Sequence, residues 1–285
     1  MISEIRRYIV QWGLRAMKKT GMLSHINFTI SSWEDSGISV PIINAMGYEH
    51  FFENELWLNN LLKRLIPVYC KADYFIDVGV NTGQTLLKVK LINGEAGYLG
   101  FEPNPNCLFY LYCLIRCNKF ENVTILPYAL SNVSGMVDLN FHSASSTDSL
   151  AIIVQNFRQR SLSQIKVPLL NGDDLEFFKK CKPGVIKIDV EGGELEAIKG
   201  LERVIQRYRP IIICEVLPVY STKNKRRLKR QQELESILKD FRYCICLIDH
   251  LGSLDEIETI GIHSDISRVN YLLYPVEEKN RLDQL

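Results

Sequence analysis

The sequence predicts an α/β fold in which helices flank a seven-stranded, mostly parallel sheet. From residue 72 onward, short apolar runs alternate with amphipathic stretches, which is the pattern of parallel strands joined by helices. The length of 285 residues is enough for one large core with an addition at the N-terminus. We therefore expect a helical extension over residues 1–70 and an α/β domain over residues 71–285, with a β-rich insertion inside it.

The first twenty residues have the pattern of an amphipathic helix. Its apolar residues recur at helical spacing, and its opposite face is basic; the apolar set is Ile2, Ile5, Ile9, Trp12 and Ala16. We expect this apolar stripe to dock on the rest of the chain or on a second copy in a homodimer. A membrane surface is the alternative partner, because a basic amphipathic helix suits anionic lipid. Residues 51–66 predict another amphipathic helix.

Seven apolar runs predict the strands of the sheet. They are Tyr74–Val78, Gly97–Phe101, Val123–Pro127, Val185–Val190, Ile211–Val216, Tyr243–Ile248 and Val269–Tyr274. The helices predicted between them span residues 84–91, 105–118, 194–206 and 226–239. Two alternating segments, Met136–Phe141 and Ile165–Leu170, enclose the polar stretch HSASSTDS, which begins at His142. This pattern predicts a β-rich insertion near the mouth of a site.

The composition limits the classes of partner. A formal net charge of +1 leaves no global field that would attract nucleic acid. The eight cysteines include no CxxC pair and no metal-ligand spacing, so we expect reduced thiols and a cytoplasmic location. No run of about 18 uncharged apolar residues is present, so we expect no membrane span.

The segment FIDVGVNTGQT, residues 75–85, is the strongest motif. A buried strand ends in a loop that opens a helix, and Gly79 and Gly83 allow a tight turn with close approach of the backbone to a ligand. The spacing is GxxxG, which lacks the middle glycine of the dinucleotide fingerprint. Asp77 would repel a pyrophosphate but can serve an ammonium group. We expect Asp77, Gly79, Asn81, Thr82 and Gly83 to form one side of a cofactor site.

The next strand ends in GFEPN, nineteen residues after Gly83. Glu102 stands where Rossmann-type folds bind the ribose hydroxyls of a nucleoside. Together with the glycine loop at βαβ spacing, Glu102 and the adjacent Pro103 predict a nucleoside site. The third strand is followed by Ala129 and Leu130, which we expect to flank the base.

The fourth strand leads into IKIDVEGGELE, where Asp189 and Glu191 are two residues apart. On a strand they would face the same way, toward the crevice at its carboxyl end. A carboxylate there can accept a proton or bind a metal, so we predict catalytic roles for Asp189 and Glu191. The alternative is that Glu191 and Glu194 only favour a helix N-terminus. Glu215, at the end of the fifth strand, would complete a divalent-metal site with them if a metal is used.

The strings FIDVGVNTGQT, GFEPNP, LPYALSN and IKIDVEGGELEAIKGL resemble the motif series of the FkbM-type methyltransferases, over about residues 72–275. The resemblance implies the Rossmann-like class I methyltransferase fold, S-adenosylmethionine as cofactor, and O-methylation of a hydroxyl on a saccharide, a glycan or a related natural product. It also implies that Asp77, Gly79, Asn81, Gly83 and Glu102 contact the cofactor and that Asp189 and Glu191 stand beside the acceptor. The run Leu170–Leu175, with Asn171 and Gly172, departs from the common pattern.

Two other functions stay open at the level of the sequence. A nicotinamide-dependent oxidoreductase or epimerase is disfavoured by the missing middle glycine and by the lack of a Tyr-x-x-x-Lys pair. A non-catalytic module that binds S-adenosylmethionine would carry the same cofactor motifs without transferring a methyl group.

Overall fold

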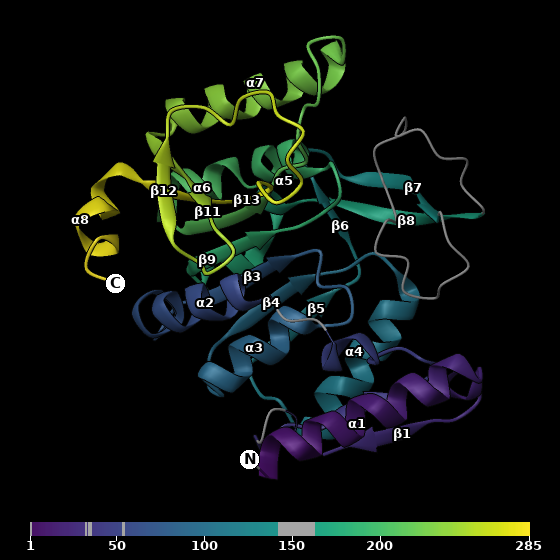
Figure 1. Cartoon of the computed structure of the whole chain (residues 1–285). Helices are drawn as coiled ribbons and strands as arrows, with labels where there is room; N and C mark the ends of the chain where they lie inside the picture. Colours follow the sequence, from purple (N-terminus) through teal and green to yellow (C-terminus); the bar gives the residue numbers. More distant parts are fainter. Residues whose placement is uncertain (1, 32, 34–35, 53–54, 142–162) are drawn as a thin grey trace.

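One eight-stranded sheet forms the centre of the computed structural model, which describes the chain apart from residues 1, 32, 34–35, 53–54 and 142–162 (Figure 1). The order across the sheet is β12-β11-β13-β10-β9-β3-β4-β5. The strands are β3 (Tyr74–Val78), β4 (Tyr98–Phe101), β5 (Val123–Leu126), β9 (Pro183–Ile188), β10 (Ile211–Glu215), β11 (Tyr243–Ile248), β12 (Leu254–Ile257) and β13 (Asn270–Pro275). Strands β10 to β5 are parallel, and the other three are antiparallel to their neighbours. The predicted mostly parallel sheet is confirmed, with β12 as an additional eighth strand.

Burial on both faces explains why the central strands read as continuous apolar runs. Every residue of β4 and β9 is buried, including Lys187. The predicted bounds match β3 and β11 at both ends and differ by one or two residues for the other five strands.

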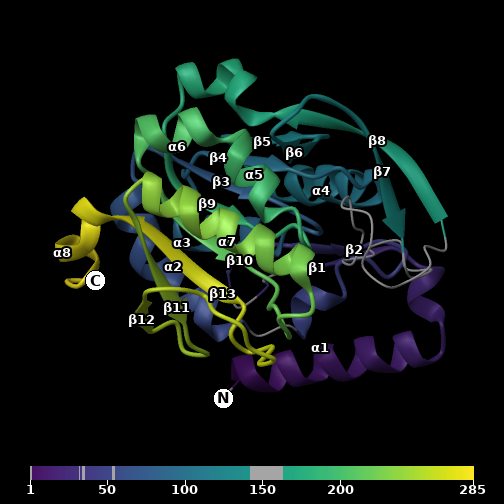
Figure 2. The same ribbon diagram turned by 90° about the horizontal axis from the view of Figure 1, so that it is seen from above.

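Helices cover both faces of the sheet (Figures 1 and 2). On one face lie α2 (Leu56–Tyr69), α3 (Gln84–Ile92) and α4 (Pro105–Asn118). On the other lie α5 (Glu194–Gly200), α6 (Glu202–Tyr208) and α7 (Lys225–Asp240). The single helix predicted over residues 194–206 is therefore two helices. Its break lies at Leu201, whose backbone dihedrals are not helical.

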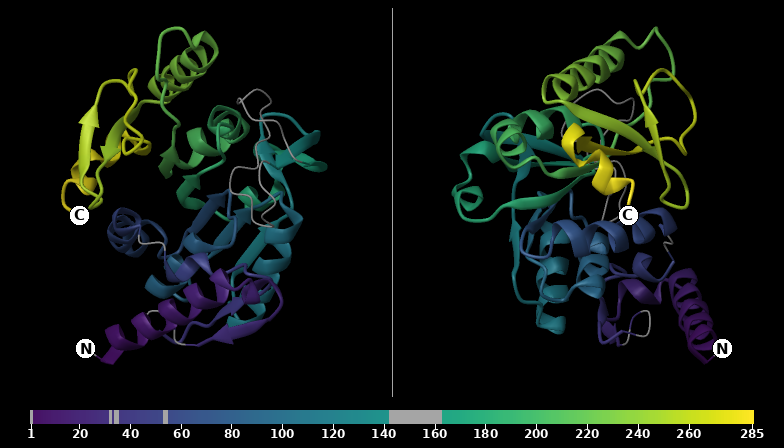
Figure 3. Two further views of the ribbon diagram at one scale, coloured as in Figure 1. Left: turned by 45° about the vertical axis from the view of Figure 1, so that its right-hand side comes forward. Right: turned by 90° about the vertical axis from the view of Figure 1, so that its left-hand side faces the viewer.

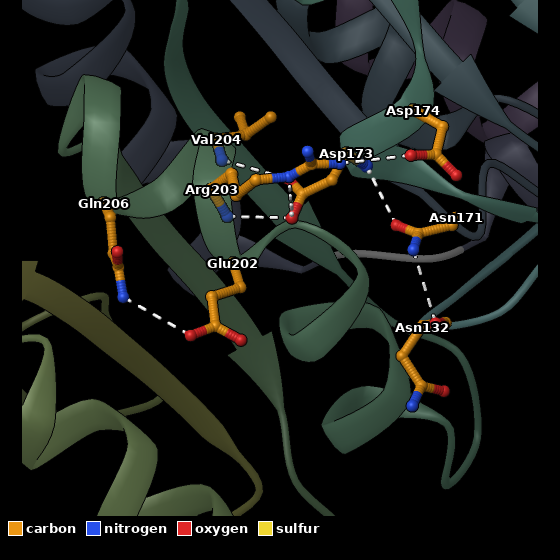
Figure 4. Close-up of polar contacts among 8 residues, drawn as sticks. All are labelled: Asn132, Asn171, Asp173, Asp174, Glu202, Arg203, Val204 and Gln206. Carbon is orange, nitrogen blue, oxygen red and sulfur yellow. Dashed lines mark hydrogen bonds and ion pairs between the residues drawn. The ribbon is translucent and has the colours of Figure 1, made fainter.

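The break between α5 and α6 is held by a side chain from a distant segment. Asp173 accepts backbone hydrogen bonds from Arg203 (2.9 Å) and Val204 (3.0 Å), so it caps the start of α6 (Figure 4). Asn171 in turn accepts from the backbone N–H of Asp173 and donates to the carbonyl of Asn132. The segment that departs from the family pattern thus has a structural role in positioning α6.

Replacing the cap should cost stability. We expect Asp173→Ala to lower the free energy of unfolding by about 1–2 kcal/mol, the usual loss when a capping acceptor is removed. Urea denaturation measures it. The matched control is Asp174→Ala, whose carboxylate makes only an exposed contact with Arg203 and should change stability by less than about 0.5 kcal/mol. Equal losses in the two variants would contradict the assigned cap.

A second sheet has the order β6-β8-β7 and corresponds to the predicted β-rich insertion. It consists of β6 (Ala129–Ser131), β7 (Gly135–Phe141) and β8 (Ser163–Asn171), and β7 and β8 pair antiparallel. The two alternating segments predicted from the sequence lie inside β7 and β8. His142 and the serine-rich stretch after it lie outside the described residues.

The N-terminal residues share one core with the sheet. After α1 (Ile2–Lys19) come a 3-10 turn (Met22–Ser24), β1 (Phe28–Ile30), β2 (Val40–Ile42) and a second 3-10 turn (Glu49–Phe51). Their buried side chains, such as Leu14 and Val40, belong to the same apolar cluster as Phe75 and Leu86 of the sheet layer. The apolar packing is continuous across residue 70. The division of the chain into two parts at that residue stays a prediction. The chain ends in a 3-10 turn (Val276–Glu278) and α8 (Lys279–Leu282).

The predicted apolar stripe of α1 is exposed where the structure describes its side chains. Ile5, Ile9 and Trp12 are exposed, whereas Leu14 is buried, with Val10 and Met17 packed beside it. The expectation that the stripe docks on its own domain is wrong, because a second, narrower apolar face of the helix makes that contact. None of the described helices has both the length and the apolar character needed to cross a bilayer.

Candidate active site

A cavity of about 460 Å³ opens at the carboxyl ends of the parallel strands. It lies where β4 and β9 flank β3, so that the chain connections run in opposite directions from this point, as ligand sites of open α/β sheets do. Its volume is in the range of pockets for molecules of nucleoside size. Nine of the predicted site residues line it: Gly79, Asn81, Glu102, Pro103, Ala129, Leu130, Asp189, Glu191 and Glu215.

The loop after β3 is shaped by its glycines. Gly79 has φ of +92°, and a Cβ there would lie 2.0 Å from the carbonyl oxygen of Asp189. Gly83 has φ of +86°, and a Cβ there would meet Leu111 of α4 at 2.8 Å. Gly79 thus allows the loops after β3 and β9 to touch at the cavity, while Gly83 allows α3 to pack on α4.

Glu102 is fixed at the end of β4 by two backbone donors. One carboxylate oxygen accepts from the N–H of Asn81 and the other from the N–H of Asn104, both at 2.7 Å. Burial raises the pKa of Glu102 to about 7 although these donors favour the charged form. Each oxygen keeps a lone pair for a further donor, so the carboxylate can accept two hydroxyls of a ligand in the cavity.

Three predicted cofactor residues lie behind the cavity wall. Asp77 is fully buried, accepts from the hydroxyl of Tyr98 and is outside the cavity lining; its other oxygen has no partner within the described residues. Burial raises the pKa of Asp77 to about 6. Thr82 is buried, and Gly83 packs on α4. Contact of Asp77, Thr82 and Gly83 with a cofactor stays a prediction.

Asp189 stands at the centre of a network of charged side chains. Lys187, buried on β9, donates to one of its oxygens at 2.8 Å, and Glu215 also hydrogen-bonds to it. Burial by itself would raise the pKa of Asp189, but the charge of Lys187 outweighs it and the pKa is lowered. Burial and the charge of Asp189 raise the pKa of Glu215 to about 8. At neutral pH Asp189 is therefore the carboxylate and Glu215 carries the shared proton.

Glu191 reaches the cavity by another route than the one predicted. Strand β9 ends at Ile188, and Glu191 lies in the following turn with φ of +52°. The inference that Glu191 and Asp189 face alike because they alternate on a strand is wrong, although both line the cavity. Glu194 begins α5 and accepts from the N–H of Gly192 at 2.6 Å, so the alternative role at the helix start applies to Glu194.

Several residues at the site have no signal in the local sequence. Glu55, at the start of α2, lines the cavity and pairs with Lys88. Arg230 of α7 binds both carboxylate oxygens of Glu196 and the carbonyl oxygen of Gly192, which fixes the loop after β9. Arg230 belongs to a run of basic residues whose pattern predicts a solvated helix face. Only Lys187 could have been predicted, because it alternates with Asp189 at the end of a strand.

The donor set fits a nucleoside cofactor better than a metal. Across the residues that the structure describes, no group of three or more His, Cys, Asp and Glu side chains is arranged to hold a metal ion. The predicted metal set is Asp189, Glu191 and Glu215. Asp189 and Glu215 are hydrogen-bonded to each other, and Asp189 also accepts a hydrogen bond from Lys187. These residues do not fit a divalent metal. Glu102, with two oxygens held toward the cavity, fits a ribose diol.

The buried carboxyls predict a pH-dependent stability. Burial is the main cause that raises the pKa of Glu102 and Glu194 to about 7 and that of Glu215 to about 8. These groups hold protons in the folded state that they lose in the unfolded chain, so the stability they contribute is lost as pH rises through these values. Burial lowers the pKa of His50 to about 4, so His50 makes the stability rise with pH, but only below about pH 6.5.

We therefore expect the free energy of unfolding of the ligand-free protein to fall between about pH 6.5 and 8.5. Thermal denaturation across this range measures it. The variant Glu194→Gln/Glu215→Gln should show a flatter profile, because two of the three groups no longer titrate. A wild-type stability that rises with pH in this window would contradict the assignment.

The chain is similar to several known proteins. The family model of the methyltransferase FkbM domain matches residues 77–245, a range that contains every predicted site residue. The hexuronic acid methyltransferase AglP of Haloferax volcanii is 28% identical over 196 residues, which are 65% of this chain and 75% of that protein. The solved structure of methyltransferase FkbM from Methylobacillus flagellatus KT is 18% identical with a TM-score of 0.45, covering 71% of this chain and 43% of that one. Precorrin-6y C5,15-methyltransferase from Geobacter metallireducens GS-15 is 14% identical with a TM-score of 0.37, covering 78% and 87%.

Proposed function

This chain belongs to the FkbM methyltransferase family, and from that premise we propose that it transfers the methyl group of S-adenosylmethionine to a hydroxyl of a saccharide, a glycan or a related metabolite. The observation that carries the proposal is the cavity itself, which brings Glu102 and the pair Asp189–Glu215 to one space. The relative named a hexuronic acid methyltransferase supports a saccharide acceptor. Membership in a methyltransferase family also argues against the nicotinamide-dependent oxidoreductase or epimerase that the sequence left open.

On the donor side, Glu102 would accept hydrogen bonds from the two ribose hydroxyls of the cofactor. Asn81 and Asn104 hold the carboxylate in place through their backbone N–H groups, so little orientation is lost on binding. Leu130 and Tyr128 line the same cavity and offer apolar surface for the base. When bound, S-adenosylmethionine would supply a methyl group activated by its sulfonium charge.

On the acceptor side, Asp189 would take the proton that the acceptor hydroxyl releases when the hydroxyl oxygen bonds to the methyl carbon. A hydroxyl oxygen that gains a methyl group becomes a strong acid, so even a carboxylate of lowered pKa can accept its proton. Lys187 and the protonated Glu215 both donate to Asp189, which orients it. Glu191 lines the same space and would hold the acceptor.

Isotope labelling tests the reaction. The full-length protein is incubated with trideuteromethyl S-adenosylmethionine and either neutral glycosides, uronides or extract, and products are analysed by mass spectrometry. We expect label in an alkali-stable methyl ether. Label that is released by mild alkali would identify a carboxyl ester and overturn hydroxyl methylation. Tight binding of the donor by calorimetry with no label in any acceptor would instead support the non-catalytic module.

A further inference from the structure

The exposed stripe of α1 is an apolar surface that the described structure leaves open to solvent. It consists of Ile5, Tyr8, Ile9 and Trp12, whose side chains are 54%, 73%, 64% and 73% exposed. Their spacing of three, four and seven residues places them on one face of the helix. Figures 2 and 3 show α1 at the periphery of the molecule, with one side toward the remaining chain. Two large aromatic rings in a contiguous exposed stripe indicate a binding surface.

The opposite face of α1 is firmly docked, so the stripe is presented outward by the fold. Leu14 is 3% exposed, and Val10 and Met17 pack against the same core. Gln11 donates from its side chain to the carbonyl of Phe51 at 2.5 Å. A rotation of the helix that buried the stripe would expose Leu14 and break this bond. The helix therefore has two apolar faces with different functions.

Positive charge is concentrated on α1. The whole chain has a net charge of +1, but α1 contains five basic residues and one acidic residue: Arg6, Arg7, Arg15, Lys18 and Lys19 against Glu4. Arg15 and Lys19 follow Trp12 by three and seven residues, so both lie on the side of the stripe, whereas the other three basic residues lie on other faces of the helix. The guanidinium of Arg15 also lies over the ring of Phe52, 4.9 Å from its centroid. All five basic side chains are exposed. Such a surface suits a partner that is both apolar and anionic.

We infer that α1 binds the surface of a membrane that contains anionic lipid. In this arrangement the helix lies in the plane of the bilayer, with Ile5 and Ile9 among the acyl chains and the rings of Tyr8 and Trp12 at the level of the headgroups. Arg15 and Lys19 then lie beside lipid phosphates. A second copy of the chain suits the surface less well, because a symmetric contact would bring two basic helices together.

Vesicle flotation with the full-length protein tests this inference independently of methyl transfer. We expect the protein to float with vesicles of phosphatidylcholine and phosphatidylglycerol, to bind pure phosphatidylcholine at least about tenfold more weakly, and to be released by salt. Trp12 also serves as a reporter, because Trp33 is buried and Trp57 is partly buried against the core. Its fluorescence should shift to shorter wavelength on binding, and this shift should be missing in Trp12→Phe.

Two matched variants distinguish binding through the exposed stripe of α1 from nonspecific adsorption to vesicles. Tyr8→Ser/Trp12→Ser should lose flotation, whereas Phe109→Ser/Tyr112→Ser, the same kind of change on the exposed side of α4, should keep it. Circular dichroism verifies that both are folded. Three results would overturn the inference: no flotation of the wild type, equal flotation of both variants, or a wild-type dimer that the Tyr8→Ser/Trp12→Ser change converts to a monomer.

Discussion

Asp189→Asn is expected to lower kcat by about 10²- to 10⁴-fold, the range by which a positioned proton acceptor accelerates a reaction. The asparagine keeps the size of the side chain and can still accept from Lys187, but it cannot take a proton from the acceptor hydroxyl. The affinity for S-adenosylmethionine should stay within about twofold, since the donor side of the cavity is unchanged. Single-turnover assays and calorimetry measure the two quantities separately.

Two further variants test whether the fall in kcat of Asp189→Asn is due to the loss of the proton acceptor. Asp255→Asn makes the same change on the exposed strand β12 and should leave kcat unchanged. Glu215→Gln keeps a donor toward Asp189 and imitates the protonated carboxyl. If Glu215 orients Asp189, the wild-type kcat should fall above about pH 8, where Glu215 ionises, and this fall should be missing in Glu215→Gln. Turnover of Asp189→Asn equal to that of the wild type would remove Asp189 from the reaction.

Glu102→Ala is the second change with a large expected effect. Loss of two charge-assisted hydrogen bonds to the ribose should weaken S-adenosylmethionine binding by about 10- to 100-fold. The fold should be retained, because the substitution removes a buried carboxyl whose pKa is already raised and leaves the N–H groups of Asn81 and Asn104 beside a cavity that water can enter. Calorimetry with the donor and with its demethylated product gives both affinities.

The pH dependence of binding provides an internal check on Glu102. A protonated carboxyl accepts hydrogen bonds poorly, so the affinity of the wild type should fall as pH decreases through about 7, where Glu102 gains a proton. Glu102→Ala should show no such fall. The control is Glu121→Ala, the same change at an exposed position next to β5. Unchanged affinity of Glu102→Ala would exclude Glu102 from the cofactor site.

The sheet could be predicted because its strands are buried on both faces. Such strands must be apolar over their whole length, so β3 and β11 stand out in the sequence at both ends. The residues directly after parallel strands share one edge of the sheet, which is why Glu102 and Asp189 could be assigned to one site from βαβ spacing alone. The helices α3, α4 and α7 were predicted to within one residue at each end, but the division of residues 194–206 into two helices was not. The break at Leu201 depends on Asp173, which is distant in sequence.

The sequence by itself thus determined the fold class, the family and the position of Glu102 and Asp189 at the cavity, because these depend on local periodicity and on the ends of strands. Only the tertiary structure decided that Asp77 points into the core, that Glu55 and Arg230 complete the site, and that the apolar stripe of α1 faces outward. The physical reason is that periodicity specifies which residues share a face but not what that face contacts. That contact is fixed by packing between segments far apart in the chain.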